Sequence, residues 1–359
     1  MKYRYLGQTG LSVSEICFGV MTFGSNGAFL GAPDRNWAEF GVVSDDDSCR
    51  MIHQALDAGV NFFDTADVYK NGQGEELLGR ALKGRRSSVI VGTKGRWATG
   101  EGPNESGSTR HHLLHAVEAS LKRMETDYID IYHLHGFDPR TAIEETLRVL
   151  DDLVRSGKVR YIGISNFAAW QVAVALGVSE SKNLERFSVY QAYYNIAARE
   201  LEHEIVPLCV DQKVGITVWS PLAGGFLTGK YRRGEAPAAG SRLSNATPFE
   251  SAPVADRTQA FDVLDAMHAI ATEHGATVAQ VALNWLRRRP GVSSLVVGAT
   301  RHEQLKENLQ SIEWDLSDAE YERLTALSER PKPYPYWHMV NVAGDRRLPH
   351  VRIPDQRDR

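Results

Sequence analysis

The chain has 359 residues, of which 42% are hydrophobic and 24% charged, with a formal net charge of -4. This mildly acidic balance argues against a nucleic-acid or anionic-membrane partner, and no apolar run reaches the roughly 18 residues that a membrane-spanning helix needs. The cysteines Cys17, Cys49 and Cys209 have neither disulfide nor zinc spacing. We therefore expect a soluble, cytoplasmic protein. No Pro-Gly-Ser linker divides it, so we predict one domain over residues 1–330 and a tail over 331–359.

Short apolar runs alternate with amphipathic segments at a period of roughly thirty residues, which is typical of βα units. The first strand is expected at 16–18, and the first helix near Asp45, with Ser44 as its N-cap and Gly59 as its stop. Further strands are expected at 61–65, 88–94, 128–135, 159–165, 187–191, 215–220 and 294–298. Further helices are expected at 75–82, 111–124, 142–155, 168–176 and 201–211. Eight strands close a (β/α)8 TIM barrel, which is the α/β fold that we predict.

Three segments do not fit a minimal barrel. Residues 25–43 and 222–256 are longer than most connections, and loops at the carboxyl ends of barrel strands carry function. The irregular tail from Pro331 holds aromatic residues among prolines, namely Tyr334, Tyr336, Trp337 and His338. The tail could line a pocket or pack across the barrel, and both interpretations remain open.

Four polar side chains fall at or just past the ends of three successive predicted strands: Asp64, Tyr69, Lys94 and His135. Tyrosine has an ordinary pKa of about 10 and donates a proton slowly unless its anion is stabilised. Lys94 can supply that stabilisation, and Asp64 can hold the lysine charge. His135 would position a substrate oxygen. The quartet is thus predicted to pass a proton to a carbonyl oxygen.

Other interpretations of these residues exist. Each residue taken singly is more often a structural ion pair or a polar core contact. His133 and His135 lie two residues apart and could hold a hydrolase metal together with Asp64. That arrangement would leave Lys94 and Tyr69 without a purpose, so we predict no metal site.

Several motifs occur in order along the chain: LGQTGLSV at 6–13, AGVNFFDTADVY at 58–69, YIGISN at 161–166, SPL at 220–222 and EN at 307–308. With these motifs the chain resembles the aldo-keto reductase superfamily from about residue 3 to residue 309. The resemblance implies a barrel closed at its base by an N-terminal hairpin, here 2–12. It also implies catalytic roles for Asp64, Tyr69, Lys94 and His135, with Tyr69 as the general acid in reduction.

The resemblance further implies NADPH, bound extended across the barrel mouth without a dinucleotide-binding fold, and no G-x-G-x-x-G follows a predicted strand. Gly19 is expected beside the nicotinamide, Ser165, Asn166 and Gln191 at its carboxamide, and Trp219 stacked on its ring. The pyrophosphate is expected at backbone groups of Ser220, Pro221, Leu222, Gly225 and Leu227 and at the side chain of Lys230. The adenosine end is expected at Gly298, Thr300, Arg301, Gln304, Glu307 and Asn308. A helix beginning near His302, together with Arg301, would favour NADPH over NADH at the 2'-phosphate.

Two functions are compatible with the sequence. The first is an NADPH-dependent reductase of an aldehyde or ketone, with alcohol oxidation as the reverse reaction. The second is a cofactor-binding regulatory subunit that resembles potassium-channel β subunits and turns over poorly. Turnover measured against cofactor binding separates them. Substrate identity and oligomeric state stay open, and an oligomer is compatible with the sequence.

Overall fold

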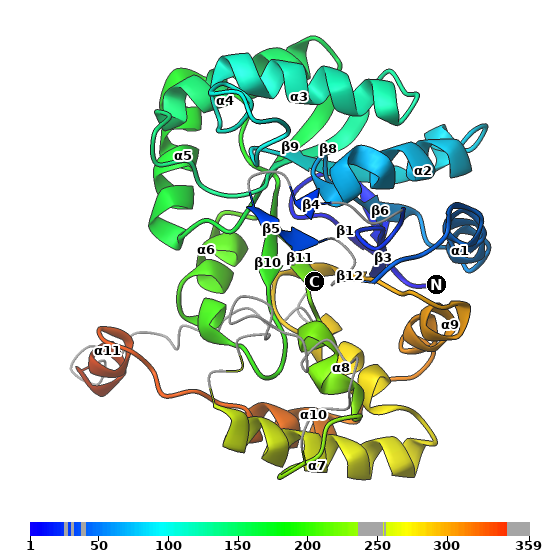
Figure 1. The fold of residues 1–359 in the computed structure, drawn as a ribbon. Helices are drawn as coiled ribbons and strands as arrows, with labels where there is room; N and C mark the ends of the chain where they lie inside the picture. The colour runs from blue at the N-terminus through cyan, green and yellow to red at the C-terminus, as the bar shows by residue number, and fades with distance from the viewer. Residues whose placement is uncertain (25–27, 30–31, 37–40, 236–253, 255, 343–359) are drawn as a thin grey trace.

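The computed structural model describes residues 1–24, 28–29, 32–36, 41–235, 254 and 256–342. Its centre is a closed barrel of eight parallel strands surrounded by helices (Figure 1), as the sequence predicts. The barrel strands are β3 (Ile16–Gly19), β6 (Phe62–Asp64), β7 (Ile90–Gly95), β8 (Ile129–Leu134), β9 (Val159–Ser165), β10 (Val189–Tyr193), β11 (Gly215–Trp219) and β12 (Val292–Val297). Neighbours in sequence are neighbours in the barrel, and β12 pairs with β3 to close it.

The helices cover the outside of the barrel. They are α1 (Asp45–Asp57), α2 (Gln73–Ala81), α3 (Arg110–Arg123), α4 (Ile143–Arg155), α5 (Ala169–Lys182), α6 (Ile205–Asp211), α7 (Arg257–His274), α8 (Val278–Arg287), α9 (His302–Gln310), α10 (Asp318–Leu327) and α11 (Tyr336–Val342). Local sequence explains where α1 begins, because the Ser44 side chain accepts a hydrogen bond from the Asp47 amide. None of the described helices is long and apolar enough to cross a membrane.

An N-terminal hairpin of β1 (Tyr3–Tyr5) and β2 (Ser12–Ser14) closes the base of the barrel. Arg4 donates to the Val292 carbonyl of β12 at 3.1 Å and to Glu15, the residue before β3, at 2.6 Å, and so ties the hairpin to the barrel. Leu6 is fully buried in a cluster with Phe62 and other residues of the strands. The predicted hairpin is confirmed, although its pairing extends to Ser14.

The main apolar core lies between the strands and the helices. It includes Phe18 and Phe63 from the strands and Met51 and Ile52 from α1, all fully buried. Because side chains alternate along a strand, the opposite faces point into the barrel. Near the carboxyl ends those inward positions are polar, including Asp64, Lys94 and His133 in the positions predicted from alternation.

Several element boundaries differ from the sequence predictions. Strand β10 begins at Val189 instead of residue 187, and α6 begins at Ile205 after a separate 3-10 turn, Glu200–His203. Pro207 lies in the first turn of α6, where its missing N–H costs no helical hydrogen bond. Helices α7, α10 and α11 were not among the predicted elements. The spacing of Ala260, Val263, Leu264 and Met267 is the signal that could have revealed α7.

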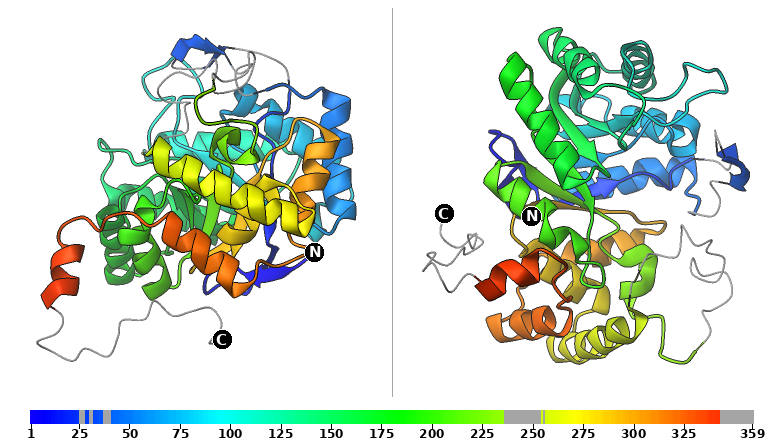
Figure 2. Two further views of the ribbon diagram at one scale, coloured as in Figure 1. Left: turned by 90° about the horizontal axis from the view of Figure 1, so that it is seen from below. Right: turned by 90° about the vertical axis from the view of Figure 1, so that its left-hand side faces the viewer.

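The two long insertions and the tail are only partly described. Within the first insertion, β4 (Ala28–Phe29) and β5 (Ala32–Asn36) form a small antiparallel sheet. Within the second, residues 236–253 and 255 lie outside the described residues. The tail is not wholly irregular, because it contains α11, which stands away from the barrel in Figure 2. Tyr336 of α11 donates to Glu204 at 3.0 Å.

Candidate active site

A buried ion pair forms the base of the site at the carboxyl ends of β6 and β7. The Lys94 ammonium donates to Asp64 Oδ2 and to the Thr65 carbonyl, both at 2.7 Å. Burial by itself would lower the pKa of Lys94, but the Asp64 carboxylate and the Tyr69 phenol raise it above its ordinary value. Lys94 is therefore a cation at neutral pH.

Tyr69 lies beside this cation on the turn that follows β6. The Lys94 nitrogen is 5.0 Å from the centre of the Tyr69 ring. Burial raises the pKa of the phenol, and the Lys94 charge opposes that rise. Tyr69 is consequently protonated at neutral pH, as a proton donor must be.

His135 completes the quartet just past the end of β8. Its ring packs edge-on against Tyr69 at 5.6 Å and against Trp97 at 6.0 Å between centres. Burial, together with the charge of Lys94, keeps the pKa of His135 well below its usual range. The imidazole is therefore neutral at physiological pH and suited to hydrogen bonding with a substrate oxygen. The structure thus brings all four predicted residues together.

Gln191 has a partner that the sequence did not indicate. Its amide donates to Asp64 Oδ1 at 2.7 Å, so the two carboxylate oxygens of Asp64 are held by Gln191 and by Lys94. Ser165 is paired with Gln191 across β9 and β10 and is buried. Asn166 adopts a left-handed conformation (φ 60°), and its side chain donates to the His135 carbonyl at 3.0 Å.

His133 lies deeper in the barrel than His135. A Cβ on Gly163 would fall 2.6 Å from the His133 ring, so Gly163 leaves the space that the imidazole fills. Burial and the Lys94 charge lower the pKa of His133 to about 4. Among the described residues, no three His, Cys, Asp or Glu side chains are placed to share a metal ion.

Around the mouth, β11 leads into a glycine-containing turn. Trp219 and Tyr193 pack together with ring centres 4.6 Å apart. Gly224 and Gly225 both have positive φ angles, and the amide of Gly224 donates to the Ser220 hydroxyl at 3.0 Å. A Cβ on Gly225 would lie 3.3 Å from the Lys230 ammonium, so this cation sits over the turn. Nearby, Pro221 and Leu227 are buried, and Leu222 is half-buried.

The segment after β12 lies next to the end of β3. A Cβ on Gly298 would be 3.8 Å from the Gly19 carbonyl. Gln304 accepts hydrogen bonds from the amide and the hydroxyl of Thr300, at 3.0 and 3.1 Å. Arg301 is exposed at the N-cap of α9, a helix that begins at His302 as predicted. Farther along α9, Asn308 is buried and the Glu307 carbonyl accepts from Gln280 at 3.0 Å.

Behind the quartet lies a group of buried polar residues that the sequence analysis missed. Both carboxyl oxygens of Asp67 and the Tyr132 hydroxyl are buried without a hydrogen-bond partner. Burial, together with the nearby Glu75, raises the pKa of Asp67 well above its ordinary value. Glu75 itself accepts from Thr93 at 2.5 Å and from Arg123 at 2.6 Å. No local pattern distinguishes Asp67, because its environment comes from three other elements.

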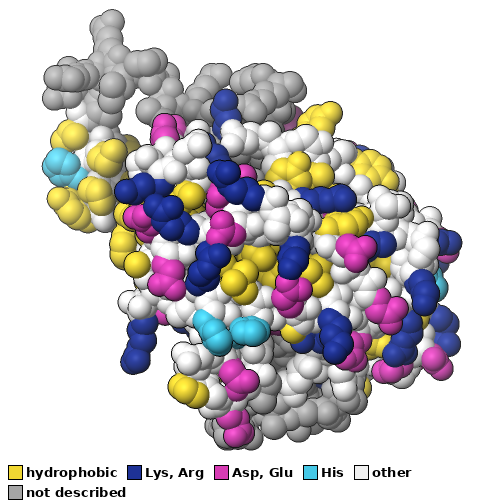
Figure 3. Space-filling view, turned by 90° about the horizontal axis from the view of Figure 1, so that it is seen from above, with side chains coloured by type: hydrophobic (Ala, Val, Ile, Leu, Met, Phe, Trp, Pro, Cys, Tyr) yellow, Lys and Arg dark blue, Asp and Glu magenta, His cyan; other side chains and the backbone are white. Residues whose placement is uncertain are grey.

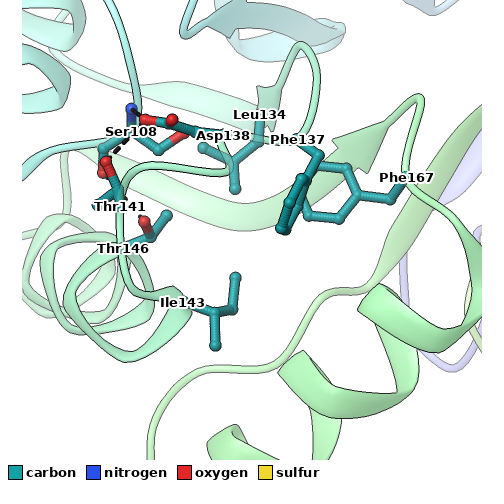
Figure 4. Close-up of a pocket in the computed structure, with 8 residues that line it drawn as sticks. All are labelled: Ser108, Leu134, Phe137, Asp138, Thr141, Ile143, Thr146 and Phe167. Carbon is teal, nitrogen blue, oxygen red and sulfur yellow. Dashed lines mark hydrogen bonds between the residues drawn. The ribbon is translucent and has the colours of Figure 1, made fainter.

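The hollow in Figure 4 lies beside the end of β8, away from the quartet. It is lined by Ser108, Leu134, Phe137, Asp138, Thr141, Ile143, Thr146 and Phe167 and holds about 10 Å³. That volume suits about one water molecule, so this hollow is no substrate site. A larger groove of about 240 Å³ between α5 and α6 also contains none of the quartet.

A closed parallel barrel with a carboxylate, an ammonium, a phenol and an imidazole at its carboxyl ends defines a class of barrel oxidoreductases. A family model for the Aldo/keto reductase family matches residues 15–329. The chain therefore belongs to the aldo-keto reductase family.

Two kinds of relatives have sequences similar to this chain. A protein of Arabidopsis thaliana named "Probable voltage-gated potassium channel subunit beta" is 38% identical over 87% of the chain and 92% of its own length. The "Versiconal hemiacetal acetate reductase" of Aspergillus parasiticus is 33% identical over 90% of the chain and 96% of its own length. An aldo-keto reductase of Alternaria alternata is 34% identical over 90% of each chain.

Proposed function

We propose that this protein is an NADPH-dependent carbonyl reductase that converts an aldehyde or ketone to an alcohol, with alcohol oxidation as the reverse reaction. The observation that carries the proposal is the contact of the Lys94 ammonium with Asp64 at 2.7 Å and its position 5.0 Å from the Tyr69 ring. A phenol beside a fixed cation can release its proton because the cation stabilises the phenolate.

Each member of the quartet has a separate task in this proposal. Tyr69 donates its proton to the carbonyl oxygen as negative charge develops there. Lys94 stabilises the resulting phenolate, and Asp64 keeps Lys94 charged. The neutral His135 binds the same oxygen and orients the carbonyl. When bound, the nicotinamide cofactor supplies the hydride that the reduction requires.

Features of the barrel mouth fit an extended NADPH molecule. The positive φ angles of Gly224 and Gly225 create a turn that side chains would obstruct, and Lys230 lies over it. We assign this turn, from Ser220 to Lys230, to the pyrophosphate. We assign Asn166, Gln191 and Trp219 to the nicotinamide. The N-terminus of α9 and Arg301 suit the 2'-phosphate.

The chain would carry this activity in residues 1–330, with 331–359 as a tail. The thiols of Cys17, Cys49 and Cys209 are free, which supports a reducing cytoplasm as the location. Basic and acidic side chains are interspersed on the face in Figure 3. This mixture supports a small-molecule substrate over nucleic acid.

The test is NADPH oxidation by the purified protein over a panel of aldehydes, ketones and quinones. Tyr69→Phe should lower kcat by about 10²-fold or more while NADPH still binds, because only the donated proton is lost. Tyr5→Phe is the matched control, since Tyr5 is 70% exposed on the hairpin at the other end of the barrel. A fully active Tyr69→Phe enzyme would refute Tyr69 as the donor.

The relatives named potassium-channel β subunits support a second candidate function, a cofactor-binding regulatory subunit. Such a protein would bind NADPH tightly and turn over poorly with every carbonyl in the panel. Wild-type protein that binds NADPH but reduces none of these compounds would favour this second function.

A further inference from the structure

The chain makes an unusual turn immediately after Tyr69. Lys70 (φ 50°, ψ 36°) and Asn71 (φ 55°, ψ 40°) are both left-handed, and Gly72 follows with φ 94°. Residues with a Cβ rarely adopt this conformation, so two in succession persist only where surrounding contacts hold them. The position of the Tyr69 ring therefore depends on what anchors this turn.

Lys70 provides an anchor that the quartet does not include. Its side chain is almost wholly buried, which is rare for lysine. Its ammonium donates to the Gly41 carbonyl at 2.9 Å. Removing an ammonium from water is costly unless it is hydrogen-bonded, so this contact should be retained whenever the turn is folded.

Gly41 also touches the segment that follows β12. A Cβ on Gly41 would lie 2.9 Å from the Thr300 methyl group, and the φ of Gly41 is +99°. Both observations require glycine at this position. Close by, the Thr22 hydroxyl donates to the Ala299 carbonyl at 3.3 Å. One backbone position thus contacts both the turn that carries Tyr69 and the segment assigned to the adenosine end of NADPH.

We propose that Lys70 is a positioning residue that, through Gly41, fixes the turn carrying Tyr69 and holds Gly41 against Thr300. Placement of the phenol and retention of NADPH then both depend on where Gly41 lies. This inference rests on the proposed function for its cofactor and reaction. It adds a residue outside the quartet, directly after Tyr69 in the chain.

The first test compares Lys70→Met with wild type. Methionine has a similar length but no donor, so the Gly41 carbonyl loses this bond. We expect NADPH to dissociate about tenfold faster and kcat to fall about tenfold, with little change in the KM for the carbonyl. Stopped-flow cofactor fluorescence and steady-state kinetics give these values. The control is Lys83→Met, because the Lys83 side chain is 82% exposed and pairs with Glu125 only at 3.9 Å.

Gly41→Ala disturbs the position of Gly41 from the side of Thr300, and keeps the proposal testable if Lys70→Met does not fold. The added methyl should push Gly41 away from Thr300 and accelerate NADPH dissociation by a similar factor. The double variant should be little worse than either single variant, because both changes displace the same residue, Gly41.

The outcomes separate this proposal from the proposed function. If wild type reduces carbonyls but Lys70→Met loses only thermal stability, with NADPH dissociation and kcat unchanged, Lys70 is merely structural and the proposal is wrong. Unchanged NADPH dissociation in a folded Gly41→Ala would also overturn it. If wild type reduces no carbonyl, the proposed function fails, whereas faster NADPH dissociation from both variants would still support the role assigned to Gly41.

Discussion

At the scale of single residues, the site is built around one carboxylate. Asp64 accepts from Lys94 and from Gln191, both at 2.7 Å, so its two oxygens serve different partners. The first contact sets the charge of the cation next to the phenol. The second links β6 to β10 across the barrel, over 127 positions of sequence.

Asp64→Asn should remove the negative charge at this position and keep the shape of the side chain. The amide has nearly the same shape but leaves the Lys94 ammonium without its counter-charge. Since Asp64 raises the pKa of Lys94 and burial lowers it, the variant's lysine should lose its proton at lower pH than wild type. We expect kcat to fall about 10²-fold, and the alkaline limb of its pH profile to move to lower pH.

The check on that prediction is a pH–rate profile of each protein. Asp57→Asn is a suitable control, because its side chain is 75% exposed and pairs with Arg85 only at 3.6 Å. An Asp64→Asn profile that overlays the wild-type profile would show that Lys94 does not depend on Asp64 for its charge.

Residue types at strand ends were predictable, whereas their partners across the barrel were not. Side-chain alternation placed Asp64 and Lys94 on inward faces, and the structure pairs them. The bond from Gln191 to Asp64 depends on the barrel being closed, which no local pattern encodes. The hydrogen bond from Lys70 likewise goes to Gly41, 29 positions away in the sequence.

At the scale of elements, strands β8 and β9 fit together only because one of them carries glycine. A Cβ on Gly163 would lie 2.6 Å from the His133 ring and 2.7 Å from a Val189 methyl group. Contacts this short require His133 and Val189 to move. Gly163 thus lets β9 lie between two strands with inward side chains.

Gly163→Ala is therefore expected to destabilise the fold by about 1–3 kcal/mol, the usual cost of overpacking. Gly177→Ala is a matched control, because in α5 its Cβ would meet nothing within 4 Å. That helical replacement should stabilise the protein by about 0.5–1 kcal/mol. Urea unfolding of both variants measures the two changes. If Gly163→Ala left the unfolding free energy unchanged, the residues around His133 would have to move to accommodate the added methyl group.

Element type was easier to predict than element boundary. The cap at Ser44 gave the start of α1 because a cap is a local contact. The end of β10 was placed at 191 instead of Tyr193, because the pairing of Tyr193 with Trp219 comes from the next strand. The sequence predicts helix before α6 because the apolar spacing continues through the 3-10 turn.

At the scale of the whole molecule, the barrel excludes water from groups that titrate in the unfolded chain. His133 is fully buried, and its pKa is lowered to about 4 from an ordinary value of 6.5. Between these values the unfolded chain binds a proton that the folded protein does not. Acid therefore favours unfolding through this residue. The stabilisation is complete above pH 6.5 and is lost as the pH falls toward 4.

His133→Asn should remove this dependence, because asparagine does not titrate. Each pKa unit corresponds to about 1.4 kcal/mol, so from pH 7.5 to pH 5 wild type should lose about 2 kcal/mol more unfolding free energy than the variant. Urea unfolding at the two pH values measures the difference, and the exposed His111 offers His111→Asn as a control that should behave as wild type. The poorer packing of asparagine will lower the unfolding free energy at both pH values. This decrease cancels because only the change with pH is compared. If wild type and His133→Asn lost equal unfolding free energy between pH 7.5 and pH 5, His133 would have to be protonated within the folded barrel. Water would then have to reach it beneath Lys94.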